Sequence, residues 1–202
     1  MAKVKVFVDL DDTLIDTSRI KKEMFDIVVR AGVDPAEVED RYRQMKESGP
    51  FTVSGFAQMF VDLTDVGELE RSIDGYFSNL GDILIQDRVD WLDNNYPASQ
   101  YERVLYTFGN PDFQRKKVEG LGISDKFDEI VYVEGDKVES LQNYISEGER
   151  FIVIDDKQEV LAGVRETYPQ AETFLARKGG VPPEVYTGTE ETGEGDLGRR
   201  NY

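Results

Sequence analysis

The sequence predicts an α/β protein built on a parallel sheet of about five strands, with an all-helical segment inserted after the first strand. Short apolar runs rich in β-branched and aromatic residues recur at positions 4–10, 103–108, 129–133, 151–154 and 173–176. From the second run onward, these runs alternate with helical patterns of roughly 10 to 13 residues. That alternation is typical of parallel strands joined by right-handed crossovers.

The helical patterns between the later runs have recognisable boundaries. Asn110 and Pro111 supply an N-cap and a first helical residue, and Gly122 stands just past the expected end. Two more helices are expected over residues 137–145 and 157–168. Each would cover one face of the sheet as it connects two strands.

The segment of about 85 residues between the first two strands has helical periodicity throughout. Helices are expected over 20–31, from residue 35 onward, over 52–63 and over 64–80. A helical insertion placed directly after the first strand is typical of a lid over the carboxyl ends of the sheet.

The resulting division of the chain has three parts. Residues 1–17 and 88–182 are expected to form the α/β core, and residues 18–87 the helical cap. Residues 183–202 are rich in Gly, Thr and Glu without a period, so we expect a poorly packed C-terminal extension, with disorder as an open alternative.

Composition narrows the chemistry that the chain can perform. The 202 residues include no cysteine and no histidine, which excludes disulfides, thiolate nucleophiles, histidine bases and imidazole metal ligands. The net charge of −17 makes nucleic acid and anionic membranes poor partners. With no long apolar run and no signal-peptide pattern, we expect a soluble cytoplasmic protein.

Acidic, hydroxyl and ammonium groups stand where four of the predicted strands end. Because the carboxyl ends of parallel strands share one edge of the sheet, we expect these groups to meet in one crevice. They are Asp9, Asp11, Thr107, Lys137, Asp155 and Asp156.

Carboxylates that converge from separate strands would repel one another unless a cation lay between them. Oxygen ligands are what Mg²⁺ prefers, so the crevice predicts a Mg²⁺ site that could also hold an anionic substrate. Lys137 would add positive charge, while Thr107, Gly109 and Asn110 would offer a hydroxyl and free N–H groups to phosphoryl oxygens at a helix N-terminus.

Asp9 and Asp11 can divide the catalytic work. Residues two apart on a strand point to the same side, so both carboxylates are expected near the substrate. One would attack phosphorus to form an aspartyl phosphate, and the other would protonate the leaving oxygen and later activate water. No histidine is needed.

These residues, in this order, resemble the four motifs of the haloacid dehalogenase (HAD) superfamily. They are Asp9-Leu10-Asp11-Asp12-Thr13-Leu14, Thr107 after an apolar run, Lys137, and Ile154-Asp155-Asp156. The resemblance implies a Rossmann-like core, a helical cap inserted after the first motif, and Mg²⁺-dependent hydrolysis of a small phosphomonoester. It covers about residues 1–17 and 88–180, and the cap matches only in position and helical character.

The resemblance also implies a role for each matched residue. Asp9 would be the nucleophile and a metal ligand, and Asp11 the general acid and base with its backbone carbonyl on the metal. Thr107 would bind phosphate, and Lys137 would steady both the nucleophile and the phosphate. Asp155 would bind the metal, and Asp156 would bind it directly or through water.

Three positions depart from the usual motifs. Asp12 stands where glycine is frequent, and no proline follows Lys137. The fourth motif lacks the further aspartate that often follows it, which leaves Glu159 or a water to fill that coordination position. These departures concern the metal geometry rather than the class of protein.

Several other functions stay open at this point. Phosphomutases and nucleotidases share the same core chemistry, whereas dehalogenases lack an aspartate at the position of Asp11. A receiver-type signalling domain also combines aspartates, Thr and Lys with Mg²⁺, but it has no helical insertion of this size. A non-catalytic, phosphate-responsive binding protein of the same fold is the remaining alternative.

Overall fold

A computed structural model describes residues 3–48, 51–179 and 181–188 and contains one six-stranded sheet in the order β3-β2-β1-β4-β5-β6. The first five strands run parallel to their neighbours. This arrangement confirms the predicted parallel sheet and its five strands. Their bounds are β1 Val4–Val8, β2 Tyr101–Phe108, β3 Glu129–Val133, β4 Phe151–Asp155 and β5 Glu172–Leu175.

A sixth strand, β6 (Glu184–Val185), lies antiparallel to β5 and was not expected from the sequence. Next to it, Tyr186 is buried and donates its N–H to the Thr173 carbonyl at 2.8 Å. The start of the predicted C-terminal extension is therefore packed, because it satisfies backbone groups on the edge of β5. The remainder of that prediction, residues 189–202, lies outside the described residues.

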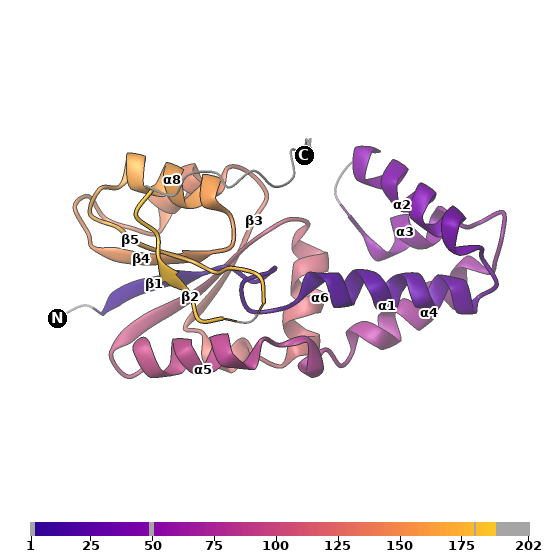
Figure 1. Ribbon diagram of the computed structural model, residues 1–202, viewed down its shortest axis with the longest axis horizontal. Helices are drawn as coiled ribbons and strands as arrows, with labels where there is room; N and C mark the ends of the chain where they lie inside the picture. The colour runs from indigo at the N-terminus through magenta and orange to yellow at the C-terminus, as the bar shows by residue number, and fades with distance from the viewer. Residues whose placement is uncertain (1–2, 49–50, 180, 189–202) are drawn as a thin grey trace.

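Helices cover both faces of the sheet, as Figure 1 shows for α8 and α5. Helices α5 (Gln86–Asn95) and α6 (Pro111–Leu121) bury apolar residues in one cluster with Val8. Helices α7 (Lys137–Ser140) and α8 (Gln158–Thr167) pack against a second cluster around Phe7. Because side chains alternate along β1, consecutive residues of the strand belong to opposite faces.

The predicted ends of α6 are confirmed, whereas α7 is shorter than expected. The side chain of Asn110 accepts a hydrogen bond from the Phe113 N–H, and Gly122 ends the helix with a left-handed φ of 63°. After Ser140 the chain tightens into a 3-10 turn, Leu141–Asn143. The Ser140 hydroxyl donates to the Lys137 carbonyl, a local bond that competes with the regular helical ladder.

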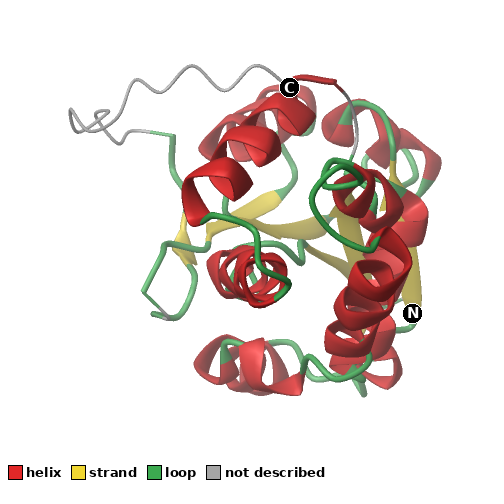
Figure 2. Ribbon diagram, turned by 90° about the vertical axis from the view of Figure 1, so that its right-hand side faces the viewer, coloured by secondary structure: helices red, strands yellow, loops and turns green. Residues whose placement is uncertain are grey.

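Between β1 and α5 the chain forms a helical insertion, residues 17–83, which lies beyond the carboxyl edge of the sheet (Figure 1). Seen from that side, its helices stand in front of the strands (Figure 2). Its third helix ends at Gln58 rather than near residue 63, where turns replace it. The helices are α1 Thr17–Arg30, α2 Pro35–Ser48, α3 Val53–Gln58, α4 Val66–Phe77 and the 3-10 turn Gly81–Ile83.

Two crossings connect the insertion to the sheet, and they lie side by side. The Ile85 N–H donates to the Leu14 carbonyl at 2.8 Å, and the Asp16 N–H donates to the Ile83 carbonyl at 3.2 Å. The insertion therefore leaves and re-enters the core at one place, directly after the acidic end of β1. None of the helices in the described part of the chain combines the length and apolar character that a membrane crossing requires.

Candidate active site

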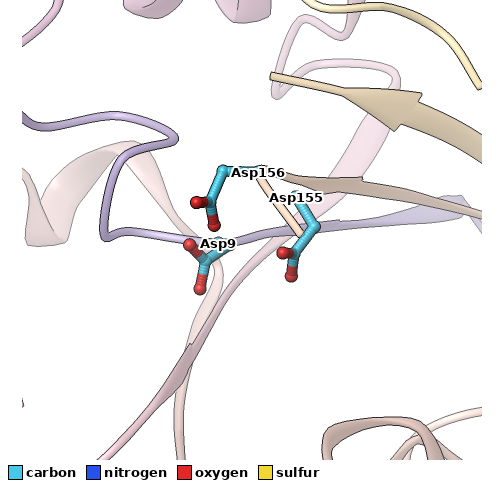
Figure 3. A group of neighbouring side chains, drawn as sticks. All are labelled: Asp9, Asp155 and Asp156. Atoms are coloured by element: carbon cyan, nitrogen blue, oxygen red, sulfur yellow. The ribbon is translucent and has the colours of Figure 1, made fainter. Parts of the chain in front are cut away.

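Three aspartates meet where β1 and β4 end. Asp9 follows β1, Asp155 is the last residue of β4, and Asp156 comes next (Figure 3). The Asp9 N–H donates to the Ile154 carbonyl at 2.9 Å, which continues the pairing of the two strands. Each aspartate offers a carboxylate oxygen within 4.8 Å of the others, and both Asp9 and Asp155 are buried.

Lys137 lies between two of these carboxylates. Its ammonium nitrogen is 2.6 Å from Asp9 Oδ1 and 2.6 Å from Asp155 Oδ2. The neighbouring Asp136 caps α7 and so fixes the residue from which Lys137 extends. Burial lowers the pKa of Lys137, but the charges of Asp9 and Asp155 raise it by more than burial lowers it. The pKa therefore lies above its usual value, and the side chain stays charged.

One lysine does not neutralise three carboxylates. Burial raises the pKa of Asp9 to about 6, opposed by Lys137 and reinforced by Asp155 and Asp11. Burial and the charges of Asp9, Asp155 and Asp12 raise the pKa of Asp156 to about 8. A hard divalent cation bound by these oxygens would remove the repulsion, so the donor set fits Mg²⁺.

Asp11 faces different groups from Asp9. Both of its carboxylate oxygens lie 2.6 Å from the Lys117 ammonium, and one accepts from the Gln114 amide at 3.0 Å. Both partners belong to α6, whereas Asp9 contacts α7. Because β1 ends at Val8, both aspartates lie in the stretch that follows the strand. Their carboxylates have different partners, while the charge of Asp11 still acts on Asp9.

Asp12 explains one departure from the resembled motif. It has a φ of 57°, in the left-handed region that glycine adopts readily and that aspartate tolerates better than most residues. Its Oδ1 accepts hydrogen bonds from the hydroxyl (2.5 Å) and the N–H (3.2 Å) of Thr17, the first residue of α1. Aspartate thus makes the same turn as glycine and also ties the turn to the insertion.

Three of the predicted phosphate-binding residues already make hydrogen bonds within the protein. The Thr107 hydroxyl is fully buried and donates to Gln114 Oε1 at 3.2 Å. Gly109 donates its N–H to the Val133 carbonyl at 2.9 Å, so the expectation of a free N–H at Gly109 is wrong. Asn110 uses its side chain as the cap of α6. Gly109 itself has a φ of 132°, and a Cβ there would lie 3.0 Å from Gln114 Nε2.

A buried arginine holds the loop after β1, which carries Asp11 and Asp12. Arg88, at 1% exposure, donates to the carbonyls of Asp12 and Thr13 in that loop. It also donates to the carbonyls of Arg177 and Val181, in the segment that follows β5. One guanidinium therefore fixes two loops of the site through their backbones.

Sequence reasoning missed Gln114, Lys117 and Arg88. A signal for the first two is present, because Gln114 and Lys117 share the i, i+3, i+4, i+7 spacing of the buried face of α6 with Val118 and Leu121. Polar residues at two positions of an apolar stripe indicate a buried polar contact. The sequence around Arg88 has no comparable pattern that distinguishes it from an exposed helix residue.

A cavity of about 710 Å³ adjoins the site loop between the core and the insertion. It reaches Asp12 on the core side and Tyr42 of α2 on the other. Its remaining walls are the first turn of α1, the crossing at 83–85, Arg88, and Lys178 with Gly179. Its volume lies in the range of roughly 300–1,000 Å³ that is typical of small-molecule sites.

Comparison with known proteins shows the fold. Neither a scan against protein-family models nor a search of curated proteins returned a match. Among solved structures, a protein described as a haloacid dehalogenase-like hydrolase from Burkholderia xenovorans LB400 is similar at a TM-score of 0.64 and 16% identity. That match covers 85% of this chain and 81% of the other.

Two further structures agree. A haloacid dehalogenase-like family hydrolase from Xanthomonas campestris has a TM-score of 0.51 at 19% identity, covering 80% of this chain and 78% of its own. The L-2-haloacid dehalogenase of Xanthobacter autotrophicus has a TM-score of 0.54 at 17% identity, covering 82% and 74%. The chain therefore has the fold of haloacid dehalogenase-like hydrolases, as its motifs led us to expect.

Proposed function

We propose that this chain, which has the fold of the haloacid dehalogenase-like hydrolases, is a Mg²⁺-dependent phosphatase that hydrolyses a small phosphomonoester through an aspartyl phosphate. The observation that carries the proposal is the buried Asp9 carboxylate after β1, which Lys137 holds beside Asp155 and Asp156 at the end of β4. Asp11, in the same loop, supplies the second carboxyl group that phosphoester cleavage needs.

In the first step an Asp9 oxygen attacks phosphorus, and the bond from phosphorus to the leaving oxygen breaks. Asp11 gives its proton to that oxygen, so the alcohol leaves uncharged. Lys137, at 2.6 Å from Asp9, orients the nucleophile and offers positive charge to the phosphoryl group. The products of this step are the alcohol and the Asp9 phosphate.

In the second step the Asp11 carboxylate accepts a proton from water as the water attacks phosphorus. The bond between phosphorus and the Asp9 oxygen breaks, which releases inorganic phosphate and restores the Asp9 carboxylate. The sum is hydrolysis of one phosphomonoester by one water, with Asp9 and Asp11 returned to their starting states.

Asp9, Asp155 and Asp156 would hold Mg²⁺, and the backbone carbonyl of Asp11 is a further candidate ligand. When bound, the ion would supply Lewis-acid stabilisation of phosphoryl oxygens and reduce repulsion between the substrate and the carboxylates. Asp156 lies within reach as a third carboxylate.

The cavity between the core and the insertion would take the leaving group. Its walls come from both parts of the chain, so the insertion would act as a cap that restricts the substrate to small metabolites. Phosphorylated sugars and nucleoside monophosphates both have a size that suits this volume. A nucleotidase is therefore a specific version of the same proposal. A phosphomutase, which would return the phosphoryl group from Asp9 to the sugar and not to water, is an alternative to it.

The test is Mg²⁺-dependent phosphate release from an aryl phosphate, sugar phosphates and nucleoside monophosphates. We expect Asp9→Asn to lose at least about a hundredfold in kcat/KM, roughly 2.7 kcal/mol, on every substrate. Asp125→Asn, on an exposed residue in the 3-10 turn after α6, is the matched control. A wild-type protein silent on all esters with Mg²⁺ present would overturn the proposal.

Asp11→Asn should show a dependence on the leaving group. A nitrophenolate leaves without a proton, whereas a sugar alkoxide does not, so the loss should be about tenfold or more greater for sugar phosphates than for the aryl phosphate. Equal losses on both would contradict the role of Asp11 as an acid. The comparison uses kcat/KM at one pH and one Mg²⁺ concentration.

Dehalogenation is the second candidate, favoured by the similarity to the Xanthobacter autotrophicus L-2-haloacid dehalogenase. A structure of that enzyme carries covalently bound chloropropionic acid. A halide leaves as an anion and needs no proton donor. Asp9 could still act as the nucleophile, but Asp11 would have no evident use as an acid, nor Asp155 and Asp156 as metal ligands. Halide release from 2-chloropropionate, measured with and without Mg²⁺, distinguishes the two candidates.

A further inference from the structure

Helix α6 carries two polar side chains on its buried face, close to the candidate active site. Gln114 and Lys117 are 4% and 3% exposed, and they stand beside the apolar Val118 and Leu121. A buried ammonium is costly unless it is paired and hydrogen-bonded. The group that pairs with Lys117 therefore indicates the role of this lysine.

That partner is Asp11. The Lys117 ammonium lies 2.6 Å from both carboxylate oxygens, which is a short, charge-assisted contact. Gln114 donates to the same carboxylate at 3.0 Å and to the Phe108 carbonyl at 2.8 Å. Asp11 is thus tied both to α6 and to the end of β2.

Exposure separates the two members of the ion pair. The Asp11 side chain is 31% exposed, whereas the Lys117 side chain is 4% exposed. Phe113 lies over Lys117, with the ammonium 5.0 Å from the ring centre, and Phe113 packs against Phe51 and Phe77 of the insertion. A substrate in the site can reach Asp11 but not the enclosed lysine behind it.

We infer that Lys117 is a positioning residue that holds the Asp11 carboxylate in place to accept the proton of the attacking water, with Gln114 as its second support. The inference rests on the proposed function. Asp11 lies in a loop after β1, beyond the hydrogen-bonded ladder that fixes Asp9, and the side chains that hold its carboxylate are Lys117 and Gln114. A displacement of about 1 Å in a group that transfers a proton can lower the rate about a hundredfold.

A role confined to stability is the alternative, since a buried lysine could simply balance a nearby carboxylate. The two roles differ in how substitutions at Lys117 and Asp11 combine. If Lys117 acts on catalysis through Asp11, removing it has no further catalytic effect once Asp11 cannot transfer a proton. If it only supports the fold, its effect on the rate is the same in both backgrounds.

The experiment is a double-mutant cycle on the full chain with Mg²⁺ and the best sugar phosphate of the panel. We expect Lys117→Met to lower kcat about 30-fold or more with KM changed less than about threefold, because Lys117 does not touch substrate. In an Asp11→Asn background the same substitution should change kcat less than about twofold. Arg115→Met, two positions away on an exposed side chain paired with Asp112 of the same helix, should leave kcat unchanged.

Gln114→Leu is a second test of the same inference, for use if Lys117→Met does not fold. It removes the other support of Asp11, and we expect a loss of about 5-fold or more in kcat that again disappears with Asp11→Asn. An active wild type in which Lys117→Met has no effect, or lowers kcat equally in both backgrounds, overturns the inference and leaves the phosphatase proposal standing. A silent wild type overturns both.

Discussion

Asp9, Asp155 and Asp156 bring like charges together at the end of β1 and β4, and this crowding determines how the metal-free protein responds to pH. Burial and the neighbouring carboxylates raise the pKa of Asp156 from its ordinary value of 3.8 to about 8. Below its unfolded pKa it is protonated in both states and contributes nothing. As the pH rises toward 8 the unfolded chain releases a proton that the folded chain retains, so folding becomes progressively less favourable.

Asp156→Asn should therefore stabilise the metal-free protein more at pH 8.5 than at pH 5. Asparagine resembles the protonated aspartate and carries no charge to bury. We expect the free energy of unfolding to rise by about 1–3 kcal/mol more at the higher pH, from roughly 1.4 kcal/mol per pKa unit with allowance for relaxation. Urea unfolding in EDTA at the two pH values measures this difference, with Asp125→Asn as the exposed control.

A gain that does not change with pH would contradict this account of Asp156. In that case the benefit would come from packing or hydrogen bonding, and the electrostatic origin of the raised pKa would be wrong. The opposite sign, with less stabilisation at pH 8.5, would indicate that the ionised Asp156 has a favourable partner in the metal-free fold.

At the scale of elements, α6 connects the active site with the insertion. Its Gly120 carbonyl accepts the Leu80 N–H at 2.8 Å, and Lys116 pairs with Asp74 of α4. A Cβ built on Gly120 would lie 1.9 Å from the Phe77 carbonyl oxygen, so α4 approaches α6 at backbone distance. The helix that holds Asp11 is thus also the helix on which the insertion docks.

Gly120→Ala should disturb this docking. Because the obstacle is a backbone carbonyl, the added methyl group forces α4 and α6 apart, and we expect a loss of at least about 2 kcal/mol in the free energy of unfolding. Gly75→Ala is the matched control, since no atom lies within 4 Å of a Cβ at that exposed position in α4. Replacing a helical glycine by alanine there should stabilise by about 0.5–1 kcal/mol.

Urea unfolding of the two variants tests the close approach. If Gly120→Ala is as stable as the wild type, then α4 and α6 do not touch at this point in solution. Phosphate release by Gly120→Ala gives a second measure, because separation of α6 from the insertion should also loosen the Lys117 contact.

At the scale of the whole molecule, the net negative charge affects both ligand binding and stability. The chain has 41 acidic and 24 basic residues, so its surface repels itself as well as anionic ligands. An anionic substrate must therefore be attracted locally, by Lys137 and a bound cation, against the field of the molecule. The same field makes the stability of the protein dependent on salt.

Sodium chloride and magnesium chloride should act differently. Raising NaCl from roughly 20 to 300 mM should raise Tm by a few degrees through screening alone. At matched ionic strength, MgCl₂ should raise Tm further. The reason is that binding adds about 2.7 kcal/mol to the free energy of unfolding when Mg²⁺ is near 100 times its Kd. This measurement reports binding without requiring turnover.

Asp155→Asn is the variant that separates the two effects. It removes one carboxylate of the cluster, so the increment specific to Mg²⁺ should be lost while the response to NaCl remains. If wild type and Asp155→Asn respond identically to MgCl₂, the three aspartates are not a Mg²⁺ site. Differential scanning fluorimetry at fixed protein concentration is sufficient for the comparison.

Much of the fold could be predicted from local patterns. The alternation of apolar runs with helical periods predicted the five parallel strands, and Asn110 with Gly122 predicted both ends of α6. The meeting of Asp9, Asp155 and Lys137 followed from one geometric rule, that parallel strands end at the same edge. These features depend on residues near one another in the chain or on a property shared by all parallel sheets.

Other features required the tertiary structure. Asp11 turns to α6 because the strand ends before it, and its partner Lys117 is 106 positions away in the chain. The Gly109 N–H is used by β3, and residues 184–185 complete the sheet edge as β6. Local sequence determines which groups can be buried and where helices and strands begin. Which donor meets which acceptor depends on how distant elements pack, and here that packing decided which carboxylate each lysine holds.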